Sequence, residues 1–291
     1  MKYKVVHITT YDYSESVPLC HNEVHLTPRE HDRQLCTAHR ITIRPTPSGQ
    51  EQVRDYFGNP SQFFSIQEGH KRLSVTAVSR VELSPPPPLD ATQTPSWNVV
   101  RDRLKNRDLP EGLDPVQFLF ESPQIVGDEA LQAYAAPSFA EGRNWFEAVT
   151  DLMNRIYREF KYDPTATTVS TPIREVLRIR RGVCQDFAHL MIGCLRAVGL
   201  SARYVSGYLL TRPPPGQPRL VGADASHAWV SAWCPEIGWI DFDPTNNCRP
   251  GVEHITLAWG REYGDVCPIM GVFIGGGQNQ MTVSVDVMPV E

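Results

Sequence analysis

Four consecutive prolines at positions 85–88 divide the sequence into two parts with different residue patterns. Proline lacks a backbone N–H and fixes φ, so a proline run forms a stiff extended spacer that neither a helix nor a central strand can pass through. We therefore predict an N-terminal domain over residues 1–84, a Pro-rich linker over 85–97 and a second domain over 98–291. A chain of 291 residues is long enough for two domains.

The segment before the prolines is predicted to be β-rich. Its apolar residues occur in short runs of β-branched and aromatic side chains, separated by turn signals at 45–49 and 58–60. These runs predict strands over residues 3–10, 38–44, 62–67 and 73–83.

The segment after the prolines changes to a helical pattern. Apolar residues recur at helical spacing from Trp145 to Phe160, and Asn144 with Glu147 forms the capping pattern of a helix N-terminus. The predicted fold class is α+β, with helices packed on an antiparallel sheet. The predicted elements are helices over residues 144–160, 171–182 and 183–198, strands over 202–210, 227–233 and 239–243, and a final hairpin strand over 281–287.

Charge and hydropathy argue against two classes of partner. The chain carries 28 Lys and Arg against 33 Asp and Glu, a net charge of −5, whereas a nucleic-acid-binding protein usually presents a basic face. It has no apolar stretch of the ~20 residues that span a bilayer, and no apolar run typical of a signal peptide at its start. We expect a cytoplasmic protein with no nucleic-acid and no membrane partner.

The cysteines favour a reducing compartment. Seven cysteines without a C-x-x-C pair argue against a disulfide framework and against a zinc ribbon. One stretch is dense in cysteine and histidine, but its spacing is not that of a zinc finger, so we predict no metal site there. The stretch contains Cys20, His21, His25, His31, Cys36 and His39.

Cys184 is the candidate nucleophile. It stands at the predicted start of a helix, directly after Arg180, Arg181, Gly182 and one further residue. The partial positive charge of a helix N-terminus and the two arginines favour the thiolate, which is the nucleophilic form of cysteine. Gly182 is expected to let the chain enter the helix without crowding the sulfur, and the first-turn N–H groups are candidate oxyanion donors. The alternative is that Cys184 is a small buried apolar residue, as we expect for the other six cysteines.

A nucleophilic cysteine needs a base, and His227 is the candidate. It begins a predicted strand, which would hold the imidazole ring rigidly, whereas the alternative for a lone histidine is a structural role. The next strand carries Asp241 and Asp243, and a carboxylate there is expected to orient the imidazole. Periodicity does not choose between the two aspartates, because both fall on one face of the strand. The alternative is a turn aspartate before Pro244.

Other residues receive weaker expectations. Asp186 is expected to cap the cysteine helix, and His189 lies about 140° around that helix from Cys184 and so is not expected to serve the sulfur. A loop over residues 213–224 and a segment over 263–265 are expected to border a cleft. At least half of four tryptophans in this region are expected to pack in the core, namely Trp229, Trp233, Trp239 and Trp259.

Three sequence motifs, in this order, resemble those of the transglutaminase-like superfamily. RGVCQDFA at 181–188 is similar to its nucleophile motif, HAWV at 227–230 to its histidine motif, and GWIDFDPT at 238–245 to its aspartate motif. In that family the catalytic carboxylate precedes Pro-Thr, so the resemblance selects Asp243. YFGN at 56–59 and the surrounding β region resemble the bacterial transglutaminase-like N-terminal domain. The core resemblance covers about residues 145–250 and, with the N-terminal module, most of the chain.

The resemblance implies a papain-like, transglutaminase-core cysteine enzyme fold with an N-terminal β-rich domain. It implies thiol-dependent acyl transfer on peptide or protein amides through Cys184, His227 and Asp243 and a thioester, with hydrolysis favoured because the whole chain resembles bacterial transglutaminase-like cysteine proteases. The alternatives are a protein-glutamine transglutaminase with an amine acceptor and a catalytically silent binding module. We expect a peptide or protein substrate and no cofactor, since no calcium loop is visible. Family members usually add a side-chain oxyanion donor, for which Tyr162 and Trp145 are the candidates.

Overall fold

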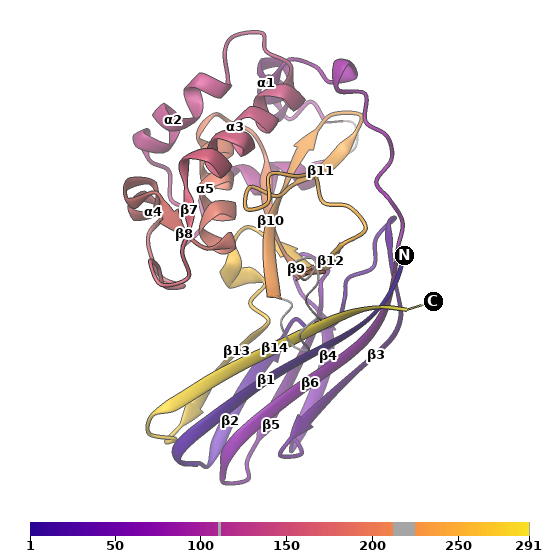
Figure 1. Ribbon diagram of the computed structural model, residues 1–291, viewed down its shortest axis with the longest axis vertical. Coiled ribbons are helices and arrows are strands. Elements are labelled where there is room, and N and C mark those ends of the chain that lie inside the picture. The colour runs from indigo at the N-terminus through magenta and orange to yellow at the C-terminus, as the bar shows by residue number, and fades with distance from the viewer. Residues whose placement is uncertain (110–111, 212–224, 291) are drawn as a thin grey trace, which may run out of the picture.

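The structure is a computed structural model that describes residues 1–109, 112–211 and 225–290. Figure 1 shows a part rich in helices above a part built of long strands, with the two chain ends close together. The α+β class is confirmed, with antiparallel sheets and a β-rich N-terminal region. No described helix is both long enough and apolar enough to cross a membrane.

Two four-stranded antiparallel sheets form the β-rich part, and they enclose one apolar core. Their strand orders are β14-β1-β6-β3 and β13-β2-β5-β4. Val17, Phe64 and Val75 are among the core residues, each from a strand whose apolar side chains alternate with exposed ones. The strands are β1 (Lys2–Val17), β2 (Leu19–Val24), β3 (Gln34–Arg44), β4 (Gly49–Arg54), β5 (Pro60–Ile66), β6 (His70–Leu83), β13 (Ile269–Ile274) and β14 (Asn279–Val290).

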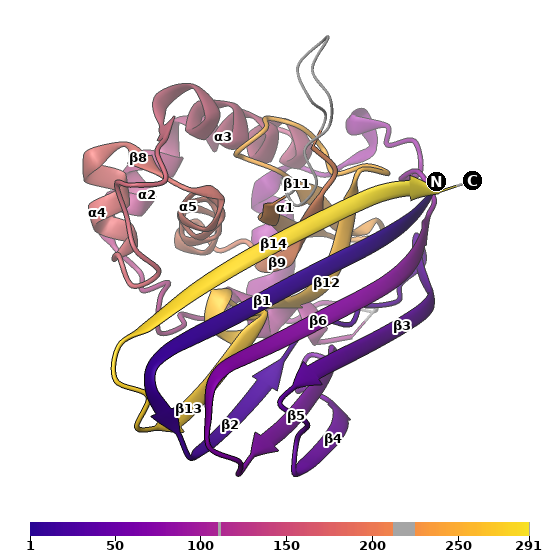
Figure 2. The same ribbon diagram turned by 60° about the horizontal axis from the view of Figure 1, so that its bottom comes forward.

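The last two strands of the chain complete both of these sheets. β14 pairs with β1 over the whole interval from Lys2↔Val290 to Tyr13↔Asn279, and β13 pairs with β2. The predicted hairpin for residues 281–287 is therefore wrong in its partner, because this strand pairs with the first strand of the chain (Figure 2). The boundary at the Pro-rich linker stays a prediction.

A third antiparallel sheet, ordered β11-β10-β9-β12, carries the helices on one face. Its central helix is α5, in which every residue from Asp186 to Leu195 is buried. The strands are β9 (Ala202–Leu209), β10 (Ala225–Cys234), β11 (Gly238–Phe242) and β12 (His254–Gly260), and β7 (Lys161–Tyr162) pairs with β8 (Arg181–Gly182) apart from them. The helices are α1 (Trp97–Asn106), α2 (Glu129–Ala135), α3 (Trp145–Glu159), α4 (Ile173–Ile179) and α5 (Cys184–Ala197), with short 3-10 turns η1 (Ala91–Gln93), η2 (Asp114–Leu119), η3 (Ala136–Ser138) and η4 (Tyr263–Asp265).

The strongest helix prediction is confirmed in detail. α3 follows the predicted range, and the Asn144 side chain accepts a hydrogen bond from the Glu147 N–H at 3.2 Å. The helix predicted over residues 171–182 is shorter, because Arg180 adopts a left-handed φ of 56° that ends α4.

Side chains of the N-terminal part join the two parts of the molecule by forming hydrogen bonds with the edge of the third sheet. β12 is an edge strand, and its exposed backbone groups at Thr256 and Trp259 are paired by the side-chain amides of Gln34 and Asn59. Asn59 is itself held by Asp55, with bonds of 2.7 and 2.6 Å. This gives the YFGN motif a structural role, since its asparagine docks the N-terminal sheets on the third sheet. An apolar cluster that includes Tyr3, Tyr208 and Val287 seals the same junction.

Candidate active site

Cys184 is the first residue of α5, and the buried remainder of that helix fixes its position. The Asp186 carboxylate accepts hydrogen bonds from the Val183 N–H at 2.8 Å and the Thr167 hydroxyl at 2.7 Å, as expected for a capping residue. The Cys184 N–H has no acceptor among the described residues, so it is available to a ligand beside the sulfur. Burial raises the pKa of Asp186, although these two hydrogen bonds oppose the shift.

Two predicted reasons for the reactivity of Cys184 need correction. Arg180 is paired with Glu159 at 2.7 Å, and Arg181 is paired with Asp163 at 3.5 Å. Each arginine therefore has a carboxylate as its ionic partner, and neither has the Cys184 sulfur in that place. A Cβ on Gly182 would lie 2.5 Å from the Asp186 carboxylate, so the glycine makes room for the cap rather than for the sulfur.

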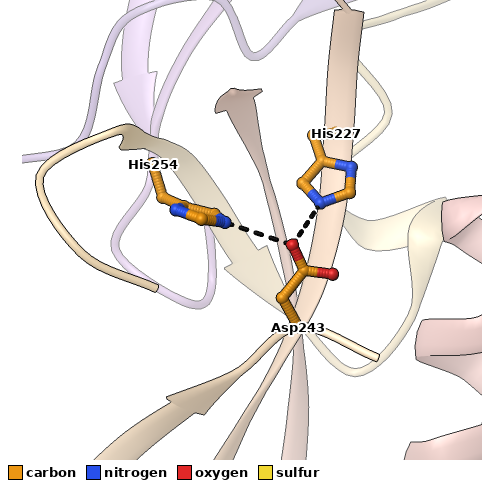
Figure 3. Close-up of side chains that lie close together, drawn as sticks. All are labelled: His227, Asp243 and His254. Atoms are coloured by element: carbon orange, nitrogen blue, oxygen red, sulfur yellow. Dashed lines mark hydrogen bonds and ion pairs between the residues drawn. The ribbon is translucent and has the colours of Figure 1, made fainter. Parts of the chain in front are cut away.

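His227 lies on β10, and its side chain is buried. Its Nε2 is 2.7 Å from Oδ2 of Asp243, and the ring and Cys184 line the same cavity. Figure 3 shows Nε2 directed at the carboxylate and the second ring nitrogen directed away from it. Burial alone would lower the pKa of His227, but the hydrogen bonds with Asp243 and Cys184 outweigh it and raise the pKa to about 10. The structure thus brings the three predicted residues together.

Asp243 is fully buried and accepts several hydrogen bonds. Its Oδ2 faces Nε2 of His227 at 2.7 Å, Nε2 of His254 at 3.1 Å and Nδ2 of Asn246 at 2.7 Å. Its Oδ1 accepts from the backbone N–H groups of Thr245 at 2.9 Å and Asn246 at 3.1 Å. Burial opposes the charge, but these donors lower the pKa of Asp243 far enough to keep it a carboxylate.

The other aspartate, Asp241, faces a different partner. Its carboxylate lies 3.2 Å from the Arg33 guanidinium of the N-terminal part. β11 ends at Phe242, and Asp243 forms an isolated bridge with Cys248 that closes the following turn, so the regular alternation of the strand does not extend to it. In the structure it is therefore Asp243, and not Asp241, that lies beside His227.

Sequence reasoning missed His254 and Asn246. His254 begins β12, packs edge-on against Trp229 with ring centroids 5.3 Å apart, and reaches the same oxygen of Asp243 as His227 but from a different direction (Figure 3). Its short, mostly apolar strand carries no local signal for this contact. Asn246 lies three residues after Asp243, a spacing typical of a turn whose side chain folds back on the aspartate, and this signal was present in the sequence.

These residues fit a hydrogen-bonded network better than a metal centre. In the described part of the chain, His227, Asp243 and His254 are one group of metal-ligating type whose ligand atoms lie within 4.8 Å of one another. Two ligands of a tetrahedral zinc ion are about 3.3 Å apart, given bonds of about 2.0 Å, whereas Nε2 of His227 and Oδ2 of Asp243 are 2.7 Å apart, a hydrogen-bond distance.

The histidine side chains of the cysteine- and histidine-rich stretch do not converge on one point. His21 bonds Ser65, His39 bonds Ser79, and His25 lies near Asp55.

A cavity of about 480 Å³ adjoins both Cys184 and His227. Tyr263 borders it, as expected, whereas Asp265 is turned away and paired with Arg261. The predicted wall at residues 213–224 lies outside the described residues.

The two candidate oxyanion donors, Trp145 and Tyr162, lie in different surroundings. Trp145 is buried in the core against Phe242 and lies away from the cavity. Tyr162 is 54% exposed, and its pKa is raised by burial and by its proximity to Cys184. Of the tryptophans, Trp229 lies beside His227 and Trp233 packs in the core, whereas Trp239 and Trp259 enclose the Arg203 guanidinium.

A half-buried thiol at the N-terminus of a buried helix, facing an imidazole on an antiparallel sheet, defines the class of transglutaminase-like cysteine protease folds. Residues 3–82 match the bacterial transglutaminase-like N-terminal region, and residues 132–244 match the transglutaminase-like superfamily. The chain belongs to the transglutaminase-like superfamily. This membership supports a thiol-dependent enzyme in the broad sense.

Individual relatives agree with the family. An uncharacterized protein of Mycobacterium tuberculosis is 44% identical over 298 residues, covering 100% of this chain and 93% of the relative. A protein-glutamine gamma-glutamyltransferase of Pseudomonas aeruginosa is 31% identical over 158 residues, covering 52% of this chain and 21% of that protein. A solved structure described as a candidate cysteine protease, from Cytophaga hutchinsonii, is 21% identical with a TM-score of 0.76, covering 100% of this chain and 92% of that chain; it supports the fold alone.

Proposed function

We propose that this chain hydrolyses amide bonds of peptides or proteins, with Cys184 as nucleophile, His227 as proton carrier and Asp243 as the orienting carboxylate. One observation carries the proposal: side chains from α5, β10 and the segment after β11 come together, with Nε2 of His227 bonded to Asp243 and both His227 and Cys184 lining one cavity. Far apart in sequence, these are the groups that activate a thiol and protonate a leaving amine.

The steps follow from this geometry. The thiolate of Cys184 attacks the amide carbonyl carbon, and the carbonyl electron pair moves to oxygen, where the Cys184 N–H stabilises it. The C–N bond then breaks as the imidazolium of His227 gives its proton to the leaving amine, and a thioester remains. Water attacks the thioester carbonyl as the neutral His227 takes one of its protons, the C–S bond breaks, and the acid product leaves with the Cys184 thiolate and the His227 imidazolium restored. The Asp243 carboxylate favours the imidazolium throughout.

His254 and Asn246 are positioning residues in this proposal. They donate to the same carboxylate oxygen that faces His227, which fixes the carboxylate orientation from two further directions. The peptide or protein substrate and the cytoplasmic location belong to the same proposal, and the free state of all seven cysteines supports the location.

Amine transfer is the second candidate, because one relative carries the name protein-glutamine gamma-glutamyltransferase. The test incubates wild type and Cys184→Ala with a glutamine-containing peptide, with and without a labelled primary amine, and follows the products by mass spectrometry. Free acid formed only by wild type supports hydrolysis, and incorporated amine would replace hydrolysis by transfer. A wild type that forms neither product, and whose Cys184 is no more reactive to iodoacetamide than the other cysteines, would support the alternative of a catalytically silent binding module.

A further inference from the structure

The cavity beside Cys184 lies between the two parts of the molecule. α5, β9 and β10 supply one side of it, and strands β1 and β14 supply the other. Three cross-strand pairs form the β1–β14 side: His7↔Val285, Thr9↔Val283 and Tyr11↔Met281. The N-terminal sheet, and with it the last strand of the chain, is therefore a wall of the candidate active site (Figure 2).

Apart from Cys184 and His227 themselves, the described residues that line this cavity carry no fixed charge, since none of them is Asp, Glu, Lys or Arg. His7 is neutral there, because its two ring nitrogens bond Tyr208 at 2.9 Å and Thr9 at 2.8 Å, and burial lowers its pKa to about 4. The polar lining consists mainly of hydroxyl groups, such as those of Tyr204 and Ser206. A charged side chain entering this space away from His227 and Cys184 would lose its hydration without gaining an ionic partner, whereas an apolar one gains by leaving water.

The β1–β14 wall also presents apolar surface that is still exposed. Along one face of β14, Val287 and Val285 are fully buried, but Val283 is 47% exposed and Met281 55% exposed. β14 is an edge strand of its sheet, and such apolar exposure on an edge strand is usually avoided unless a partner covers it. Val283 and Met281, the two exposed residues, both line the cavity.

We propose that the β1–β14 wall, with Val283 and Met281 at its centre, is the specificity-determining surface of the enzyme. It receives an extended peptide segment whose side chains next to the reacting amide are apolar and uncharged. This inference rests on the proposed function, since it takes Cys184 to be the attacking group.

The test uses two alkylating probes and needs no identified substrate. N-benzyl iodoacetamide and N-(2-hydroxyethyl) iodoacetamide carry the same reactive carbon, and the rate at which each labels Cys184 is followed by peptide mass spectrometry. Burial of part of the benzyl group should make it react about tenfold faster than the hydroxyethyl probe. Val283→Asp and, separately, Met281→Asp should each remove this preference, because each places a carboxylate on the wall.

Thr282→Asp is the matched control. Thr282 is the neighbouring residue of the same strand, is exposed and points to the opposite sheet face, so its variant should keep the tenfold preference. Equal rates of the two probes on wild type, or a preference that survives both wall variants, would overturn the inference while leaving the thiol chemistry intact. A Cys184 that labels no faster than the other six cysteines would instead overturn the proposed function and this inference with it.

Discussion

Asp243→Asn should separate the role of the buried carboxylate from that of the fold around it. In the native chain burial works against a charged His227, yet the bonds with Asp243 and Cys184 raise its pKa from 6.5 to about 10. Asparagine keeps the size of the side chain but removes its charge. The lowering effect of burial on the pKa of His227 is then less opposed, so this pKa falls towards 6.5 or lower. At 1.36 kcal/mol per pKa unit, the interval between 6.5 and about 10 corresponds to at most about 5 kcal/mol.

The assay is the pH dependence of kcat/KM on the peptide that wild type hydrolyses best. At pH 8 the wild-type imidazole is almost entirely protonated, and that of Asp243→Asn is mostly neutral. We expect the alkaline limb of the profile to move down towards neutral pH, with a loss of about 100-fold or more at pH 8. Asp241→Asn is the matched control, because it removes a carboxylate two residues away that pairs with Arg33, and its profile should stay in place.

The same assignment predicts how the stability of the protein depends on pH. The folded-state pKa of His227 lies above its ordinary value, so its stabilising contribution is complete below about pH 6.5 and is lost as the pH rises through about 10. Asp243 has a lowered pKa, so its contribution is present above 3.8 and is lost as the pH falls below that value. Urea unfolding of wild type should show the alkaline decline, and Asp243→Asn should not. An alkaline limb that does not move in Asp243→Asn would refute the assigned coupling of the two residues.

Variants at three further positions test the supporting contacts. His254→Leu removes a donor 3.1 Å from the Asp243 carboxylate and should lower the free energy of unfolding by about 2 kcal/mol and kcat about tenfold, whereas His254→Gln, which keeps a donor, should restore much of both; equal losses in the two variants would contradict a positioning role. Gly182→Ala places a Cβ 2.5 Å from the Asp186 carboxylate and should lower the free energy of unfolding by about 1–3 kcal/mol in urea titrations; an unchanged midpoint would contradict the tight packing. Asn59→Ala removes both bonds to the edge strand at Trp259 and should cost about 1–3 kcal/mol, and an unchanged midpoint would mean that the asparagine does not help to join the two parts.

Helices α3 and α5 could be predicted from sequence because their signals are local. α3 combines a cap at Asn144 with an apolar stripe over four turns, and α5 begins at the residue that the charge argument singled out. Shorter elements such as β4 and β12 were missed, since strands of six or seven residues without clear alternation carry little information on their own.

The parts of the site that escaped prediction depend on contacts between distant residues. Asp241 and Asp243 are equivalent in a strand pattern, and only the end of β11 at Phe242 and the position of Arg33 distinguish them. His254 reaches Asp243 because β12 lies at the edge of the sheet beyond β9, an order that no local pattern encodes. The pairing of β14 with β1 joins opposite ends of the chain and has the same cause.

The position of β14 has a consequence for how the molecule matures. Translation runs from β1 towards β14, so the helix bearing residue 184 and the strand bearing residue 227 leave the ribosome well before the strand that borders their shared space. Until β14 emerges, β1 keeps one edge without a neighbour and the thiol faces an unfinished surface. A nascent chain that lacks β14 therefore holds these side chains without the wall that borders their shared space, and the site is complete only once this strand has been made.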